Sequence, residues 1–183
     1  LIVASVLYNQ VGQHELGKHY AEEVLADSPA PRARCFANNL LLESYYHLKS
    51  LPENEADIHT MIATCSEQGE VLAANMSRIY LAKKWLADGE TKKAVAFLED
   101  HLAEAESTKY PKLISEVHSL LAQYKFQSNE LAQAEHHANV AVKASASIPY
   151  SPSLAVAEKT LYEIGLRRKD SAMAFEHFRK YAE

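Results

Sequence analysis

The feature that most constrains this chain is a small residue that returns at a nearly constant interval. Each copy has a turn residue, an Ala or Gly five positions later, and apolar residues about four and seven positions beyond that. The small residues are Gly17, Ala56, Ala94, Ala134 and Ala174, separated by 39, 38, 40 and 40 positions. A fixed period in this range is the signature of a solenoid, in which similar units stack on one another.

The residues between the small positions indicate that the repeating unit is helical. The 183 residues include only 5 Gly and 6 Pro, and the stretches between them are rich in Ala, Leu, Glu, Lys and Gln, the strong helix formers. Apolar residues recur every three or four positions, as in 79–86, which is typical of one helical face and not of a strand. The sequence therefore predicts an all-α fold: a right-handed α-α superhelix of about five helical hairpins with a period of 38–40, forming a single domain over 1–183.

Each predicted hairpin contains two helices joined by a tight turn. The hairpin units are about 1–29, 30–69, 70–109, 110–149 and 150–183. The first helices are expected at a truncated 1–11 and at 33–49, 72–87, 112–127 and 153–168, and the second helices at 14–27, 53–68, 90–106, 130–145 and 170–183. Ser50 and Glu53 form a capping box, and Ser151 caps a helix that opens with Pro152.

The small residue has a steric explanation. An Ala or Gly near the start of the second helix lets its backbone approach the first helix, whereas a bulky side chain would push the two helices apart. We therefore expect all five small residues to lie at close contacts within their hairpins.

This pattern resembles the tetratricopeptide repeat, a family of paired helices. The resemblance lies in Leu81-Ala82 followed by Trp85, in Leu121-Ala122 followed by Tyr124, and in the turn residues five positions before Ala94 and Ala134. The chain departs from the family in length, because the family's unit has 34 residues. It also places Tyr162 at a small-residue position and Gly165 at an aromatic one.

A narrower resemblance concerns the last helix, residues 174–183. It looks like the closing helix of long-repeat sensor regions in bacterial signalling proteins, which often runs into a GGDEF diguanylate cyclase. That resemblance implies a non-catalytic protein- or peptide-binding or sensory module that regulates such an output domain. Two alternatives stay open: a ligand-sensing arm of a transcriptional regulator or peptide-pheromone receptor, and a purely structural dimerisation scaffold.

No motif in the chain indicates catalysis, a cofactor or a metal. Glycine-rich phosphate loops, nucleophile elbows and zinc signatures are absent from the sequence, so we expect no enzyme in this segment, although a parent protein with a GGDEF domain would be one. The adjacent His136 and His137 are interpreted as two partly exposed helix histidines.

The net charge of the chain and its first seven residues indicate which partners and which cellular location to expect. A net charge of −5 provides no attraction for nucleic acid. The apolar run of residues 1–7 is too short to span a membrane and lacks the basic region of a signal peptide. We expect a cytoplasmic piece of a longer protein that makes no membrane contact through this segment.

In the tetratricopeptide family, the first helices line a concave groove that binds peptides. Carried over by position, this resemblance implies a mixed polar and apolar groove, which suits a peptide or protein segment better than a phosphate backbone. The implied groove residues are Asn38, Leu41, Tyr45, Met76, Ile79, Lys83, Glu116, Ser119, Gln123, Val156, Lys159 and Glu163.

The two cysteines fall symmetrically about a predicted hairpin turn. At 1.5 Å of rise per residue, Cys35 and Cys65 lie at nearly the same height on antiparallel helices. We expect free buried thiols, as is usual in the cytosol. A disulfide is the alternative, which a Cα separation beyond about 7 Å would exclude.

The last hairpin carries a stripe of aromatic residues at three-residue spacing. Phe175, Phe178 and Tyr181 would be left open if nothing stacks on the final helix. We therefore expect this face to form a homodimer or to lie against a following linker.

Overall fold

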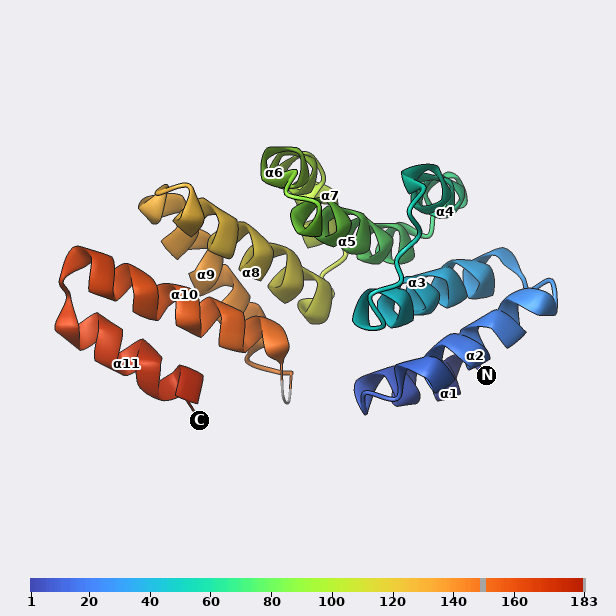
Figure 1. The fold of residues 1–183 in the computed structure, drawn as a ribbon, viewed down its shortest axis with the longest axis horizontal. Coiled ribbons are helices and arrows are strands. Elements are labelled where there is room, and N and C mark those ends of the chain that lie inside the picture. The colour runs from blue at the N-terminus through green and yellow to red at the C-terminus, as the bar shows by residue number, and fades with distance from the viewer. Residues whose placement is uncertain (149–150, 183) are drawn as a thin grey trace. The chain divides into compact units, whose positions relative to one another are not determined.

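A computed structural model describes residues 1–148 and 151–182, and this part of the chain contains α-helices and no strand (Figure 1). The predicted all-α class is confirmed. The helices are α1 (Ile2–Gln10), α2 (His14–Ala26), α3 (Pro31–His47), α4 (Glu55–Glu67), α5 (Val71–Ala87), α6 (Thr91–Asp100), α7 (Leu102–Ser107), α8 (Pro111–Gln127), α9 (Leu131–Ser145), α10 (Pro152–Arg168) and α11 (Ser171–Ala182).

The chain divides into two compact units. Unit 1 is Leu1–Ala94 and unit 2 is Val95–Glu183. In unit 1, α1 packs on α2 and α3, α2 packs on α3, and α5 contacts both α3 and α4. In unit 2, α8 pairs with α9 and α10 pairs with α11, while α10 also contacts α8 and α9. The grouping of all hairpins into one repeat domain stays a prediction.

The helix boundaries lie close to those expected, with one interruption. The predicted helix over 90–106 is divided into α6 and α7 at His101. The ring Nδ1 of His101 lies 2.9 Å from the carbonyl oxygen of Phe97, the acceptor that the next helical turn would use. A side chain that competes for a helical carbonyl is a recognised cause of local helix disruption.

One of the two predicted caps is correct. The hydroxyl of Ser151 accepts a hydrogen bond from the Leu154 amide at 3.3 Å. The capping box at Ser50 is wrong, because α4 begins at Glu55 and Asn54 accepts from the Ala56 amide at 3.1 Å. The segment that joins α3 to α4 is consequently Leu48–Asn54, longer than the three-residue turns before α6 and α9.

Four of the five predicted small residues are buried in their hairpins. Gly17, Ala94, Ala134 and Ala174 each lie three positions after the first residue of their helix and are buried. A Cβ on Gly17 would collide with the side chain of Asn9.

The prediction of a buried small residue in α4 is wrong. Ala56 is exposed, and the equivalent position of α4, three after its first residue, is Ile58, which is fully buried. Because the α3–α4 segment is long, α4 starts at Glu55, two residues later than the repeat predicts. Counting along the sequence therefore points to Ala56, although Ile58 occupies the equivalent position in the helix. The α3–α4 hairpin thus carries a bulky residue where the others carry Gly or Ala.

The core of unit 1 combines an apolar cluster with a buried polar bridge. Ala21, Leu40 and Leu41 form the cluster. Beside it, the side-chain amide of Asn9 donates to the Leu40 carbonyl at 3.2 Å and accepts from the Ser44 hydroxyl at 2.9 Å. These two bonds connect α1 to α3.

The core of unit 2 is built mainly from alanines. Ala122, Ala138, Ala141 and Ala157 form a fully buried cluster with Leu161. Small side chains on three helices allow close backbone contact. In the next hairpin, a Cβ on Gly165 would come within 2.7 Å of the Ala174 backbone nitrogen, so that α10–α11 contact requires glycine.

Cys35 and Cys65 form a disulfide between α3 and α4. Their Cα atoms are 5.6 Å apart, inside the range that a bridge requires. The predicted symmetry about the turn is therefore confirmed, and the expectation of two free thiols is wrong. Both cysteines are fully buried, in a cluster with Ala73 and Ala74 of α5.

Polar contacts also join successive hairpins within each unit. In unit 1, Lys93 of α6 binds Glu55 of α4 at 3.1 Å, across 38 positions of sequence. In unit 2, Arg167 at the end of α10 donates to the side chain of Asn129 at 3.2 Å, also 38 positions away.

Within the described residues, no helix has both the length and the apolar character needed to cross a membrane.

Candidate functional site: a hollow at the ends of α3 and α5

A partly open hollow lies in unit 1, where α3 and α5 both end. Its volume is about 570 Å³, which is within the range of ligand sites. Its walls are formed by Tyr46, His47, Lys49, Leu51, Lys83, Lys84, Ala87 and Asp88. The long α3–α4 segment contributes Lys49 and Leu51, so the hollow depends on the feature that distinguishes this hairpin.

Two of the three lysines in the wall of the hollow contact an acidic or aromatic side chain. Lys84 binds Asp88 at 2.9 Å. The Lys83 ammonium lies 4.5 Å from the ring centroid of Tyr46 and 4.9 Å from that of Tyr80, a distance at which aromatic faces attract cations. Both α3 and α5 end here, and helix C-termini carry partial negative charge. The positive charges of Lys83 and Lys84 therefore lie beside negative or electron-rich groups.

The aromatic wall of the hollow is supported by α2. The ring of His47 stacks on that of His14, with centroids 4.2 Å apart and planes inclined by 5°. The Nδ1 atom of His14 lies 3.2 Å from Oδ1 of Asn9. Asn9, whose buried amide joins α1 to α3, therefore also contacts His14, and His14 in turn supports the ring of His47.

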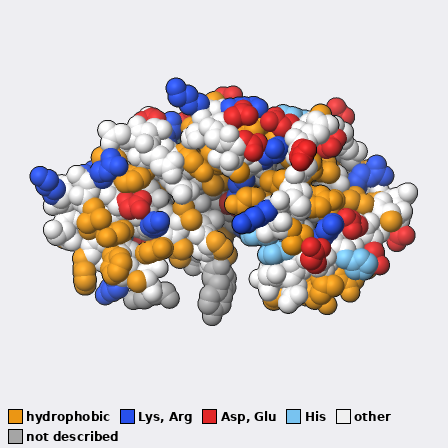
Figure 2. All heavy atoms as spheres, viewed as in Figure 1, with side chains coloured by type: hydrophobic (Ala, Val, Ile, Leu, Met, Phe, Trp, Pro, Cys, Tyr) orange, Lys and Arg blue, Asp and Glu red, His pale blue; other side chains and the backbone are white. Residues whose placement is uncertain are grey.

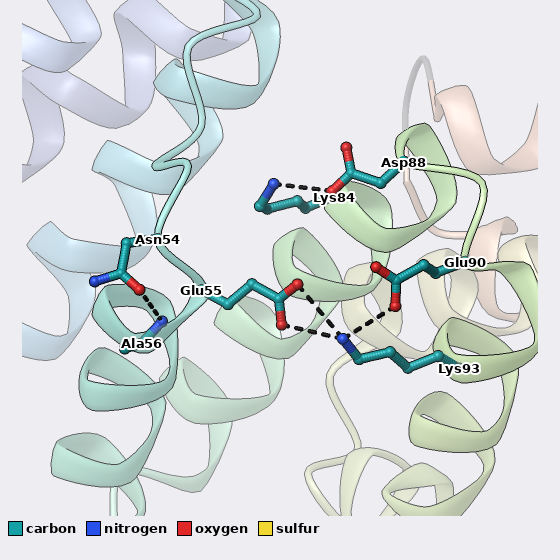
Figure 3. Close-up of polar contacts among 7 residues, drawn as sticks. All are labelled: Asn54, Glu55, Ala56, Lys84, Asp88, Glu90 and Lys93. Atoms are coloured by element: carbon teal, nitrogen blue, oxygen red, sulfur yellow. Dashed lines mark hydrogen bonds and ion pairs between the residues drawn. The ribbon is translucent and has the colours of Figure 1, made fainter.

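An ion-pair cluster lies beside the Lys84–Asp88 pair, as Figure 3 shows. Lys93 binds Glu55 and Glu90, each at 3.1 Å, and its ammonium lies 4.2 Å from the ring centroid of Trp85. Hydrogen bonds from Trp85 and then Lys93 lower the pKa of Glu55 below its ordinary value. The cluster links the starts of α4 and α6, and it holds α4 beside the hollow.

The structure divides the predicted groove residues between the two units. The six in unit 1 are Asn38, Leu41, Tyr45, Met76, Ile79 and Lys83, and the six in unit 2 are Glu116, Ser119, Gln123, Val156, Lys159 and Glu163. Leu41, Ile79 and Ser119 are buried, so their side chains pack within the protein. Lys159 is exposed and the other eight are half-buried. Only Lys83 belongs to the hollow, and a continuous groove stays a prediction.

The other residues of the hollow were missed by sequence reasoning. Most of them sit in the last turn of a first helix or just after it, whereas the repeat pattern directed attention to mid-helix positions. Leu51 had been counted as a turn residue. Its place in the wall depends on the path of residues 48–54, for which the repeat pattern offers no equivalent.

Unit 2 contains a buried histidine pair that the sequence interpretation described incorrectly. His136 is exposed as expected, but His137 is buried and its Nδ1 atom lies 3.0 Å from Nδ1 of His118. On its other side, Nε2 of His118 contacts Glu106 at 3.2 Å. The pair joins α8 to α9, as the cysteine pair joins α3 to α4.

The contacts of the pair define its protonation. A carboxylate only accepts, so Nε2 of His118 donates to Glu106. When both rings are neutral, Nδ1 of His118 then accepts from Nδ1 of His137. Both rings are neutral in this arrangement. Burial, followed by the nearby His118 and His136, lowers the pKa of His137 to about 4. Burial also lowers the pKa of His118, although Glu106 opposes the change.

The aromatic stripe on α11 lies at the surface. Phe175, Phe178 and Tyr181 are 71%, 47% and 41% exposed, and Figure 2 shows hydrophobic side chains gathered over the region of α10 and α11. Phe178 packs against α10, where its ring centroid lies 5.4 Å from that of Tyr162. The stripe is available for contact with another surface, while the predicted homodimer stays untested.

No cluster of three or more metal-binding side chains occurs in residues 1–148 and 151–182. No family model matches the chain, and neither a curated protein nor a solved structure matches it.

Proposed function

We propose that this chain is a non-catalytic binding module that captures a peptide or protein segment, and that the hollow of unit 1 receives one side chain of that segment. The observation that carries the proposal is the composition of the hollow. Leu51, Ala87 and the ring of Tyr46 provide apolar surface, and the paired Lys84 and Asp88 provide polar groups beside it. Such a wall suits an uncharged or weakly polar side chain better than a phosphate.

The wider scaffold is proposed to be a tetratricopeptide-like right-handed superhelix. The helices that begin at Pro31, Val71, Pro111 and Pro152 all have 17 residues. Their starts are separated by 40, 40 and 41 positions, which supports a regular repeat. In this arrangement the half-buried groove residues would continue the binding surface beyond the hollow. The module would regulate an output domain of a bacterial signalling protein, such as a diguanylate cyclase.

A second candidate is a structural scaffold that dimerises through α11. The exposure of Phe175, Phe178 and Tyr181 favours it. Sedimentation of the wild-type chain and of a Phe175→Ser variant over a range of concentrations separates the two functions. A monomer at all concentrations would remove dimerisation through this face, and a dimer that the substitution dissociates would support it.

Peptide binding is tested by filling the hollow. Peptides selected from a random displayed library on the wild-type chain are measured against Ala87→Arg, which places a long side chain in the hollow, and against Ala132→Arg, a matched change at an exposed position of α9. We expect Ala87→Arg to weaken binding about tenfold or more, equivalent to about 1.4 kcal/mol, and Ala132→Arg to have no effect. Equal binding by both variants would contradict a role for the hollow.

A further inference from the structure

The disulfide closes the open end of the α3–α4 hairpin. Cys35 lies in the first turns of α3 and Cys65 in the last turn of α4, and the two are 30 positions apart. The segment Leu48–Asn54 closes the opposite end. The hairpin is therefore connected covalently at both ends.

This hairpin differs from its neighbours in the contacts available between its two helices. Ile58 is the fourth residue of α4, where α2, α6, α9 and α11 have Gly or Ala. Close backbone approach, which small residues allow elsewhere, is not available there. The bridge supplies a connection at the one hairpin that lacks a small residue.

We propose that Cys35 and Cys65 are oxidised by thiol–disulfide exchange before α5 packs over the α3–α4 hairpin, and that the chain works in an oxidising compartment. Both cysteines are 0% exposed and are covered by Ala73 and Ala74 of α5. Exchange requires a thiolate and an attacked sulfur that can meet, so the reaction takes place while α5 is not yet packed over them. Cytosolic reductants keep thiols reduced, and the bridge is thus at odds with the cytoplasmic location expected from the sequence.

The chemistry needs an external oxidant, which is a protein or small molecule that carries a disulfide. The thiolate of one cysteine attacks the oxidant's disulfide and releases one of its sulfurs as a thiol. The second cysteine then attacks the mixed disulfide and releases the other sulfur. Two thiols of this chain and one disulfide of the oxidant become one disulfide and two thiols, so atoms, protons and electrons balance.

The experiment compares the full chain produced in two compartments of one bacterial host. One form is exported to the periplasm behind a cleavable leader, and the other stays in the cytosol. Cells are quenched in acid, free thiols are alkylated after denaturation, and the mass of the chain counts them. Hydrogen exchange of the purified forms then reports on each helix, and a Cys35→Ala, Cys65→Ala double variant provides the reference without a bridge.

We expect no alkylated cysteine in the exported chain and two in the cytosolic one. Amides of α3 and α4 should exchange about tenfold faster or more in the cytosolic chain and in the double variant, whereas α8 and α9 should be unchanged. An exported chain with two free thiols would overturn oxidation, and a bridged cytosolic chain would overturn the requirement for an oxidising compartment. Equal exchange in all three forms would overturn the structural role of the bridge.

Discussion

The α3–α4 hairpin of unit 1 and the α8–α9 hairpin of unit 2 follow one helical plan but are held together differently. In the α8–α9 hairpin, the chain turns through Ser128–Glu130, and the fourth residue of α9 is the buried Ala134. In the α3–α4 hairpin, seven residues join the helices and the fourth residue of α4 is the buried Ile58. Among the described residues, only the α3–α4 hairpin contains a disulfide.

The difference indicates that a covalent bond can replace close packing in a helical hairpin. Small residues stabilise α8–α9 through many short contacts spread along the interface, because alanines from α8, α9 and α10 form one cluster. In α3–α4, one bond fixes the separation at the open end. This solution leaves room for a longer connecting segment, and that segment forms part of the hollow.

The largest effect is expected from removing the bridge. A Cys35→Ala, Cys65→Ala double variant frees a loop of 30 positions, which the loop-entropy relation translates into a loss of about 3 to 4 kcal/mol in the free energy of unfolding. Equilibrium unfolding in urea, followed by circular dichroism, measures the loss. Treating wild type with reductant should reproduce it, and the double variant itself should not respond to reductant.

The next prediction concerns the α8–α9 hairpin, which is given an isoleucine at the position equivalent to Ile58 of α4. Ala134→Ile places a bulky side chain at a fully buried position of α9, and we expect a loss of about 2 to 3 kcal/mol through overpacking. Ala132→Ile, at an exposed position of the same helix, controls for the lower helix propensity of Ile. Similar stabilities for the two variants would show that α8–α9 does not depend on a small residue.

Acid should weaken α8–α9 and leave α3–α4 largely unaffected. His137 is neutral in the folded state because burial lowers its pKa to about 4, whereas the unfolded chain binds a proton near pH 6.5. Its contribution is therefore present above pH 6.5 and declines as the pH falls towards 4, by about 2 kcal/mol. Urea unfolding at several pH values measures this slope, which a His137→Gln variant should flatten.

Unit 1 also contains a buried amide whose replacement should increase stability. Asn39 is fully buried, and neither atom of its side-chain amide has a hydrogen-bond partner among the described residues. Asn39→Leu keeps the branched shape and removes the cost of burying an unpaired polar group, so we expect a gain of about 1 to 2 kcal/mol. Ser115, which is hydrogen-bonded to Ser145 in unit 2, is the matched control, since Ser115→Ala should reduce stability.

The smallest effect concerns the start of α4. Asn54→Ala removes the hydrogen bond to the Ala56 amide and should lower stability by about 1 kcal/mol. The start of α9 has no side-chain cap, so Glu130→Gln, which alters only the Lys125 contact there, should have a smaller effect. Thermal unfolding of the two variants side by side would show whether α4 depends more on its cap than α9 does.

Helix type and position could be predicted from the sequence because they depend on local patterns. Propensity, three- and four-residue spacing and turn residues located the first helices to within about two residues. The cysteine pair could be located for the same reason, since symmetry about a turn is a property of sequence spacing. The interruption at His101 was missed, because it arises from one side chain and one carbonyl.

The hollow could not be predicted because it depends on how elements pack. Ile58 was hidden by the length of Leu48–Asn54, which shifted the repeat count so that Ala56 took its place. The same segment places Leu51 against residues of α5 that lie more than 30 positions away. A periodic sequence pattern cannot predict the path of a segment whose length departs from the period.

The polar contacts that join residues 38 positions apart also bear on how the protein folds. Glu55 with Lys93 and Asn129 with Arg167 each connect one hairpin to the next along the chain. Because each of these contacts reaches only to the next hairpin, its formation does not have to wait for more distant parts of the chain. Each unit can therefore begin to form from any hairpin and extend to its neighbour. A chain made in this way can acquire its early hairpins while later ones are still being synthesised, and the cysteines of the second hairpin come together at that early stage.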